Sequence, residues 1–453
     1  MTRPHQLADF ADRLTAATVA MGRANPRPVQ GRVLDISGAI LHAALGTAPI
    51  GAICQIGAPA TGTMAEVIGL RQGTALLSPF GTTQGLVGGA AVRVVGPTLT
   101  LPVGISLLGR VVSGLGQIMD GLGPLAGTRL RPARGAAPDP VSRPLIDTRL
   151  VTGLRSLDAF CTFGRGQRLG IFGAPGAGKS MLLAALARNC AADVIVIGLI
   201  GERGREVREF IERRLPESHR QRTIVVASTS DRPPLERVYA AHYATAIAEE
   251  LRDQGKSVLL LIDSLTRVAR ALREIGLAAG EPPTRRGYPA SVYAALPELI
   301  ERSGRTATGD ITAVYTVLIE GDGEGDPIAE EVRSLTDGHI MLSPSIAGRG
   351  RYPAIDVMTS LSRLMPDVVS RDELRVAAAA RAQLAKYAEI ELLVQVGEYR
   401  AGSDAAADRA IDNHAALETF LAQGTEDSGG NQSDMWISLA RIIGEPAPRP
   451  AQP

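Results

Sequence analysis

Lysine is nearly absent from this chain of 453 residues. The 48 basic residues include only three lysines, Lys179, Lys256 and Lys386, and every other one is arginine. Aromatic residues make up 4% of the chain, and the net charge is +1. Proteins that bind nucleic acid strands combine a basic groove with aromatic stacking residues, so this composition argues against a nucleic-acid partner.

Cysteine and long hydrophobic runs are also scarce. Cys54, Cys161 and Cys190 are scattered and fit neither a zinc site nor a disulfide framework. The longest apolar runs, such as residues 258–262, have the length of a strand and not of a membrane span. The N-terminus lacks the basic start, apolar middle and cleavage site of a secretory signal. We therefore expect a cytoplasmic protein.

Glycine and proline divide the first third of the chain into segments. Residues 1–28 are expected to form an N-terminal arm, which is either solvated or a helix that docks on a partner or a membrane surface, before proline and glycine interrupt it. Residues 29–98 read as short strands at intervals of about ten residues, which predicts a small β-barrel with a role in assembly. Residues 99–149 are dense in Gly and Pro, so we expect a connector with one short helix.

The periodicity changes after this connector. Between residues 150 and 366, apolar strands alternate with helices, which predicts an α/β domain with a mostly parallel sheet. Residues 367–425 carry apolar residues at helical spacing and predict a helical C-terminal domain. Residues 426–453 are rich in polar residues, Gly and Pro, and are expected to be a flexible tail around one short apolar segment.

The run "GAPGAGKS" is the strongest functional signal. It matches G-x-x-x-x-G-K-[ST], follows an apolar strand and opens a helix, which is the context of a phosphate-binding loop. In such a loop, backbone N–H groups and a helix N-terminus surround phosphate oxygens. The nucleotide-binding residues predicted by this motif are Gly173, Ala174, Pro175, Gly176, Ala177, Gly178, Lys179 and Ser180.

Two side chains of this loop carry the chemistry. Lys179 reaches the β and γ phosphates, and the Ser180 hydroxyl is a ligand for Mg²⁺. A lysine suits this place because its ammonium is compact, whereas a planar guanidinium would crowd the phosphates. ATP and Mg²⁺ are therefore the expected cofactors.

Three further charged residues follow apolar segments. Asp263 ends the strand "VLLLID", where a Walker B aspartate holds Mg²⁺, although an aspartate there also suits a helix cap. Glu202 follows the strand 194–201 and fits either a carboxylate that orients water or the solvated start of a helix. Arg363 in "SLSR" fits either an arginine finger or an ordinary surface arginine.

Longer motifs point to one family. The stretches "LLGRVVSGLGQIMDG", "GLIGERGREV" and "GRYPAIDVMTSLSRLMP", with the phosphate loop, resemble those of the rotary-type hexameric ATPases, and among these the type III secretion system ATPases most closely. The resemblance runs from about residue 28 to 425. It implies an N-terminal β-barrel that helps to assemble a ring, a RecA-like P-loop ATPase core and a helical C-terminal domain.

The resemblance also implies roles for single residues. The resemblance implies that Glu202 in "GER" is the catalytic carboxylate and that Arg203 lies nearby on the phosphate side. Arg267 in "DSLTR" is similar to the arginine that contacts the γ-phosphate region of its own subunit, and Arg363 to the finger donated to the neighbouring subunit. Tyr352 resembles the aromatic residue that packs against adenine, although a core tyrosine would look the same in sequence.

The chain departs from the family pattern in three places. Members usually read "GSGVGKST" where this chain has "APGAGKSM", so Met181 replaces a hydroxyl residue while Ser180 is retained. The stretch "EGDGEGDPIAEE" carries extra glycines, which leaves the shape of that loop open. The segment after residue 425 is longer than the resemblance leads us to expect.

The function implied is that of a homohexameric ATPase that hydrolyses ATP at subunit interfaces to release chaperones and unfold secreted proteins. Stalk and stator proteins and chaperone–effector complexes are the expected partners, with peripheral attachment to the export machinery of the bacterial inner membrane. A flagellar export ATPase is the near alternative. A non-catalytic ring subunit is disfavoured because such subunits carry glutamine in place of Glu202, and a hexameric RNA translocase because the chain lacks basic and aromatic surfaces.

Overall fold

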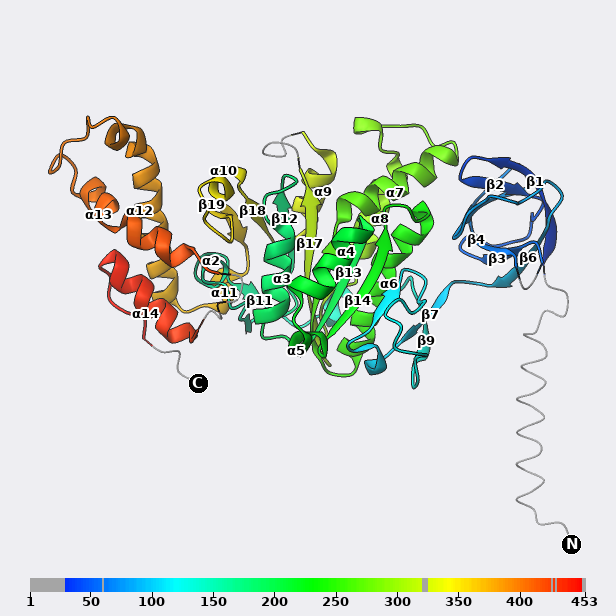
Figure 1. Ribbon diagram of the computed structural model, residues 1–453, viewed down its shortest axis with the longest axis horizontal. Coiled ribbons are helices and arrows are strands. Elements are labelled where there is room, and N and C mark those ends of the chain that lie inside the picture. The colour runs from blue at the N-terminus through cyan, green and yellow to red at the C-terminus, as the bar shows by residue number, and fades with distance from the viewer. Residues whose placement is uncertain (1–28, 59–60, 320–324, 425–426, 428–429, 450–453) are drawn as a thin grey trace, which may run out of the picture. The chain divides into compact units, whose positions relative to one another are not determined.

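The computed structural model describes residues 29–58, 61–319, 325–424, 427 and 430–449 (Figure 1). The expected N-terminal arm (1–28) and part of the glycine-containing loop (320–324) lie outside these residues. The chain divides into two compact units, one ending at Leu99 and the other beginning at Thr100.

The first unit is a closed six-stranded antiparallel barrel. Its strands are β1 (Gln30–Ser37), β2 (Ile40–Ala43), β3 (Ile53–Ile56), β4 (Thr63–Arg71), β5 (Thr74–Pro79) and β6 (Ala91–Gly96), in the order β1-β2-β5-β4-β3-β6. Apolar residues such as Val33, Val67 and Leu77 share its buried core. Gln72 and Gly73 join β4 to β5 with positive φ angles of 48° and 77°, as a tight two-residue hairpin requires.

The second unit is built on a nine-stranded sheet. Its strands are β8 (Val111–Ser113), β12 (Arg168–Gly173), β13 (Val194–Glu202), β14 (Thr223–Thr229), β15 (Ser257–Asp263), β16 (Gly304–Arg305), β17 (Asp310–Leu318), β18 (Gly338–Leu342) and β19 (Ile355–Ser362). The order is β19-β18-β12-β17-β15-β13-β14-β8, and β16 pairs with β17. All neighbours in this order are parallel except β18 and β19. Two small sheets pair β7 (Thr100–Val103) with β9 (Arg129–Pro132) and β10 (Arg149–Leu150) with β11 (Phe163–Gly164).

Helices alternate with the strands along the second unit (Figure 1). They are α2 (Arg155–Phe160), α3 (Lys179–Asn189), α4 (Gly204–Glu209), α5 (Glu217–Arg220), α6 (Pro234–Asp253), α7 (Leu265–Ala278), α8 (Ala290–Ile300), α9 (Pro327–Leu335), α10 (Pro344–Gly348) and α11 (Met365–Val368). A π-helical turn (Phe210–Arg214) continues α4. Leu183 and Leu186 of α3 share a core with the alternate strand residues Ile171, Ile195 and Ile197, whereas α6 packs along β13, β14 and β15. Because β12, β13 and β15 are parallel, their carboxyl ends lie on the same side of the sheet. Open α/β sheets bind ligands beside the carboxyl ends of their strands.

In the described part of the chain after residue 370, three helices follow: α12 (Arg371–Gln395), α13 (Ala405–Leu421) and α14 (Gln432–Ile443). The Ser370 side chain accepts a hydrogen bond from the backbone N–H of Glu373, whose carboxylate accepts one from the Ser370 N–H, so a capping box starts α12. The predicted order of β-barrel, mostly parallel α/β sheet and C-terminal helices is confirmed.

Two expectations need correction. The expectation of a flexible tail from residue 426 is wrong for residues 432–443. These residues form α14, which buries Trp436 and Leu439 in the core shared with α12 and α2. Residues 99–149, expected to be a connector, also contribute to the core of the second unit. The short apolar run of β8 pairs in parallel with β14 and forms one edge of the main sheet.

Candidate functional site

The phosphate-binding loop lies between β12 and α3, as the motif predicts. Gly176 and Gly178 have φ angles of 85° and 90°, a left-handed region that favours glycine. A Cβ atom on Gly178 would also lie 3.5 Å from the ring of Tyr352. Since α3 begins at Lys179, the unpaired N–H groups of its first turn are available to an anion beside the loop.

Lys179 is buried without a partner in the described residues. Only 9% of its surface is exposed, and its Nζ atom has no hydrogen-bond partner. Burial lowers the pKa of this ammonium, and the nearby carboxylates of Asp263 and Glu202 act in the opposite direction. A buried cation without a partner is costly, so the site is prepared for an anion that would satisfy it.

The two predicted carboxylates end neighbouring strands. Asp263 closes β15 and Glu202 closes β13, and these strands are paired in parallel. Asp263 accepts a 2.6 Å hydrogen bond from the hydroxyl of Thr316 on β17. Arg267 at the start of α7 approaches Glu202 twice, with 3.1 Å from Nε to Oε1 and 3.2 Å from Nη2 to Oε2.

The ionisation of Glu202 is strongly perturbed. Burial, together with the neighbouring carboxyl groups of Glu206 and Asp263, raises its pKa to about 7, while Arg267 opposes the shift. A carboxyl group with a pKa near neutrality is suited to accept a proton from water.

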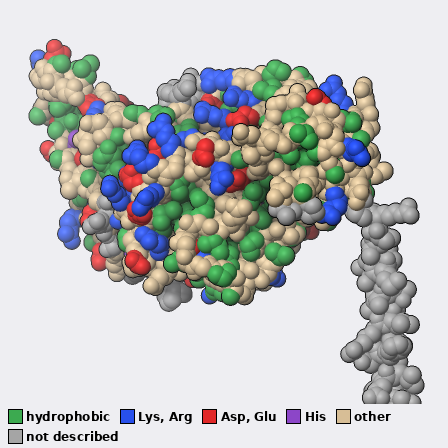
Figure 2. Space-filling view, turned by 45° about the vertical axis from the view of Figure 1, so that its right-hand side comes forward, with side chains coloured by type: hydrophobic (Ala, Val, Ile, Leu, Met, Phe, Trp, Pro, Cys, Tyr) green, Lys and Arg blue, Asp and Glu red, His purple; other side chains and the backbone are tan. Residues whose placement is uncertain are grey.

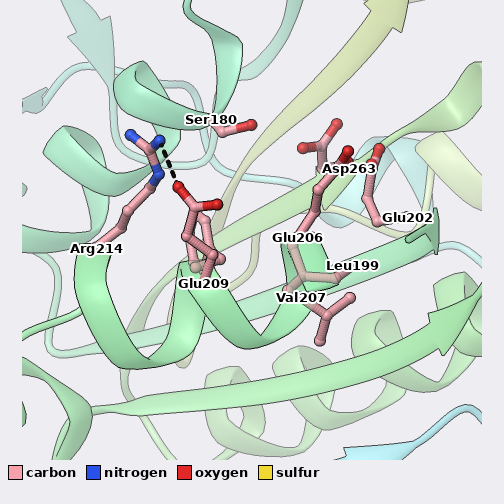
Figure 3. Close-up of a pocket in the computed structure, with 9 residues that line it drawn as sticks. Ser180, Leu199, Glu202, Glu206, Val207, Glu209, Arg214 and Asp263 are labelled. Carbon is pink, nitrogen blue, oxygen red and sulfur yellow. Dashed lines mark hydrogen bonds and ion pairs between the residues drawn. The ribbon is translucent and has the colours of Figure 1, made fainter. Parts of the chain in front are cut away.

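These groups surround one cavity of about 220 Å³ (Figure 3). Ser180, Glu202, Glu206 and Asp263 face one another across it, and Glu209 and Arg214 lie on the side of α4 and the π-helical turn, joined by a 3.1 Å ion pair. Leu199, Val207 and Phe210 complete the lining.

The structure places Arg203, Tyr352 and Arg363 outside the lining of this cavity. Arg203 is exposed and forms a 3.5 Å ion pair with Glu206. Tyr352 lies beside the loop and lines a small pocket with Met181 and Gln423. Arg363 follows β19, is exposed and does not line the cavity.

Sequence reasoning missed five residues near the site. Glu206, Glu209 and Arg214 were not singled out, although all three line the cavity. Thr316 gives no local signal, because its contact with Asp263 depends on β17 lying next to β15. Gln423, in the segment after α13, donates its backbone N–H to the carbonyl oxygen of Tyr352 at 2.7 Å.

Three family models match the chain. Residues 29–96 match the beta-barrel domain and residues 153–362 the nucleotide-binding domain of the ATP synthase alpha/beta family. Residues 369–433 match the T3SS EscN ATPase C-terminal domain. Among the described residues, no helix is long and apolar enough to span a membrane.

Curated relatives are similar over nearly their whole length. A type 3 secretion system ATPase of Xanthomonas euvesicatoria is 52% identical over 413 residues, covering 90% of this chain and 92% of the relative. A flagellum-specific ATP synthase of Treponema pallidum is 45% identical over 436 residues, which cover 96% of this chain and 97% of the relative.

Solved structures agree with this similarity. The assembled ATPase EscN of the enteropathogenic E. coli type III secretion system matches with a TM-score of 0.87 and 43% identity, covering 91% of this chain and all of that one. The same ATPase in complex with its central stalk EscO matches with a TM-score of 0.84 and 42% identity, with the same coverage.

Proposed function

The chain belongs to the type 3 secretion system ATPases of the ATP synthase alpha/beta family, and on this basis we propose that it hydrolyses Mg²⁺-bound ATP at sites shared between subunits of a homohexamer. The enzyme is an ATP hydrolase of protein secretion. The observation that carries the proposed site is the Lys179 ammonium, which has no hydrogen-bond partner among the described residues and lies in a phosphate loop next to two carboxylates.

The loop residues bind and orient the phosphates. Backbone N–H groups of residues 173–180 surround the phosphate oxygens, and Lys179 neutralises the charge on the β and γ phosphates. Mg²⁺ prefers oxygen ligands and keeps several waters, which fits a site that offers the Ser180 hydroxyl and the Asp263 carboxylate. When bound there, Mg²⁺ would neutralise negative charge on the phosphates. Tyr352 packs against the base beside Gly178.

Glu202 acts on the water that attacks the γ-phosphorus. Its carboxylate, held by Arg267, orients this water and accepts a proton from it. Arg203 lies on the same side and supports the phosphate region from the start of α4. Arg363, which is exposed and does not line the cavity of its own subunit, serves as the arginine finger of the neighbouring site.

The ring works with other proteins of a secretion apparatus. The complex of the similar ATPase with its central stalk supports a stalk partner for this chain. Stator proteins and chaperone–effector complexes are further partners, and the ring attaches peripherally to the export machinery on the cytoplasmic side of the inner membrane. Flagellum-specific relatives leave flagellar export as the alternative, but the matched C-terminal domain favours secretion.

Two measurements on the purified protein test this proposal. Glu202→Gln should bind ATP but not hydrolyse it, because the amide cannot accept the proton of the attacking water. Turnover per subunit should rise with protein concentration, because each site needs a neighbour. Hydrolysis retained by Glu202→Gln would remove this residue from the mechanism, and a flat concentration profile would contradict a shared site.

A further inference from the structure

The lining of the phosphate cavity is acidic except at one place. Glu202, Glu206, Glu209 and Asp263 contribute four carboxyl groups to it. Among the described residues that line the cavity, Arg214 alone carries a basic side chain. An anion that moves through the cavity is therefore repelled by most of the charged groups that line it and attracted by one. The proposed reaction of ATP with water gives this arginine no role.

Arg214 lies at the open end of the cavity. Asp263 is only 4% exposed and the Glu202 side chain 15%, whereas the side chains of Arg214 and Glu209 are 33% and 31% exposed. Figure 3 shows Arg214 and Glu209 on one side of the cavity and Asp263 and Glu202 on the other. A molecule that leaves the buried end for solvent on this side passes Arg214.

The π-helical turn brings Arg214 to this position. The turn continues α4, and π-helical geometry places residues i and i+5 next to each other. Glu209 and Arg214 are five positions apart, and the Arg214 Nη2 atom donates a 3.1 Å hydrogen bond to Oε1 of Glu209. A regular α-helix would pair side chains three or four positions apart instead. Such turns inside helices frequently occur at functional sites.

The Arg214 guanidinium keeps donors for a second partner. A guanidinium has five N–H groups, and within the described residues the structure shows one hydrogen bond from Arg214, the one to Glu209. The other carboxylate oxygen of Glu209, Oε2, lies 3.8 Å from Nη1 of Arg205. Glu209 therefore divides its charge between two arginines and does not fully neutralise Arg214. The remaining charge and donors suit an oxyanion with several oxygens.

We propose that Arg214 binds the inorganic phosphate released by hydrolysis, at an exit subsite beside the open end of the cavity. Attack of water on the γ-phosphorus leaves a phosphate dianion, whose oxygens match the fork of a guanidinium. The carboxylates of Glu202 and Glu206 repel this product, while Arg214 attracts it toward solvent. No covalent bond forms or breaks at Arg214. The inference rests on the proposed function and adds a product site to it.

Inhibition by inorganic phosphate tests the exit subsite. Arg214→Gln removes the charge, so the inhibition constant for phosphate, measured during ATP hydrolysis, should rise roughly tenfold. Calorimetric titration of phosphate into the protein, with ADP and Mg²⁺ present, should show the same loss of affinity without turnover. The affinity for a non-hydrolysable ATP analogue should stay nearly unchanged, because its γ-phosphate remains at the phosphate loop.

Matched variants separate this contact from a general attraction of phosphate to surface arginines. Basic side chains are common on one face of the molecule (Figure 2). Arg205 also lies near Glu209, but its side chain is 79% exposed and does not line the cavity. Arg205→Gln should therefore change phosphate inhibition far less, because solvent and salt screen its charge.

Two further variants keep the inference testable if Arg214→Gln does not fold. Arg214→Lys retains the charge and should keep part of the affinity for phosphate, although a lysine lacks the fork of donors. Glu209→Gln removes the carboxylate that competes for Arg214, so phosphate should bind several-fold more tightly. Thermal unfolding followed by circular dichroism checks that each variant is folded. Weaker phosphate binding by a folded Glu209→Gln variant would contradict the exit subsite.

The outcomes separate this inference from the proposed function. Equal phosphate inhibition of Arg214→Gln and Arg205→Gln, with hydrolysis retained, would overturn the exit subsite alone. Equal losses of affinity for phosphate and for the ATP analogue would show that Arg214 binds the nucleotide, which would also overturn it. An unmodified protein that does not hydrolyse ATP would contradict the proposed function and, with it, the product site.

Discussion

In the proposed mechanism, the perturbed pKa of Glu202 makes hydrolysis sensitive to pH. The carboxyl group accepts a proton only when ionised, and burial raises its pKa to about 7. We expect kcat/KM, which reports the ionisation of the free enzyme, to rise roughly tenfold between pH 6 and pH 8. Binding of a fluorescent nucleotide over the same range serves as the control. A kcat/KM that stays level over this range would mean that Glu202 is not the group that accepts the proton.

The hydrogen bond from Thr316 holds the carboxylate of Asp263, which we propose as a ligand for Mg²⁺, in place. Removing the hydroxyl with Thr316→Val should raise the Mg²⁺ concentration for half-maximal activity by roughly tenfold, since hydrogen bonds to charged groups contribute about 1.5–3 kcal/mol. Thr312→Val is the matched control, because Thr312 is equally buried on β17 but accepts its hydrogen bond from Gly166. Equal effects of the two variants would exclude a specific role in placing Asp263.

Some residues of the candidate site can be predicted from the sequence alone, and others cannot. The residues 173–180 could be predicted because the loop motif is local and its geometry follows from glycine and a helix start. Thr316 could not, because its role depends on which strand lies beside β15. Glu209 and Arg214 lacked a signal for a similar reason: only the course of α4 and of the π-helical turn that continues it brings them to the cavity.

At the scale of elements, α14 is the clearest difference from expectation. Polar residues and glycine precede it, so the composition favours a loose tail, but its apolar residues recur at helical spacing and pack on α2 and α12. Gln432 also donates a 2.8 Å hydrogen bond to the buried Asp158. A contact with a segment more than 270 residues away leaves no mark in the local sequence.

Stability should therefore depend on α14. Trp436→Ala should lower the free energy of unfolding by about 3–5 kcal/mol, because the side chain is buried in a packed core. Its neighbour Ile437 is 39% exposed, and Ile437→Ala should cost much less. Thermal unfolding followed by circular dichroism compares the two. If both variants unfold like the unmodified protein, α14 contributes nothing to the core.

At the scale of the whole molecule, one subunit provides only part of the proposed site. The phosphate loop, Glu202 and Asp263 meet in one cavity, while Arg363 stands exposed at the far edge of the sheet. The sequence predicted the β-barrel, the parallel α/β sheet and the C-terminal helices from periodicity and motifs. The sequence could not show which strands form the two edges of the sheet. Strand order in a parallel sheet depends on long-range packing and not on the local sequence pattern.

The central claim is that each site is shared between neighbours, and a mixing experiment tests it most directly. Arg363→Ala and Lys179→Ala subunits should each be inactive alone. In rings assembled from equal amounts of the two variants, about a quarter of the interfaces should pair an intact phosphate loop with an intact arginine finger. The account predicts that mixing restores a part of the ATPase activity. Verified mixed rings that stay inactive at every ratio would contradict it.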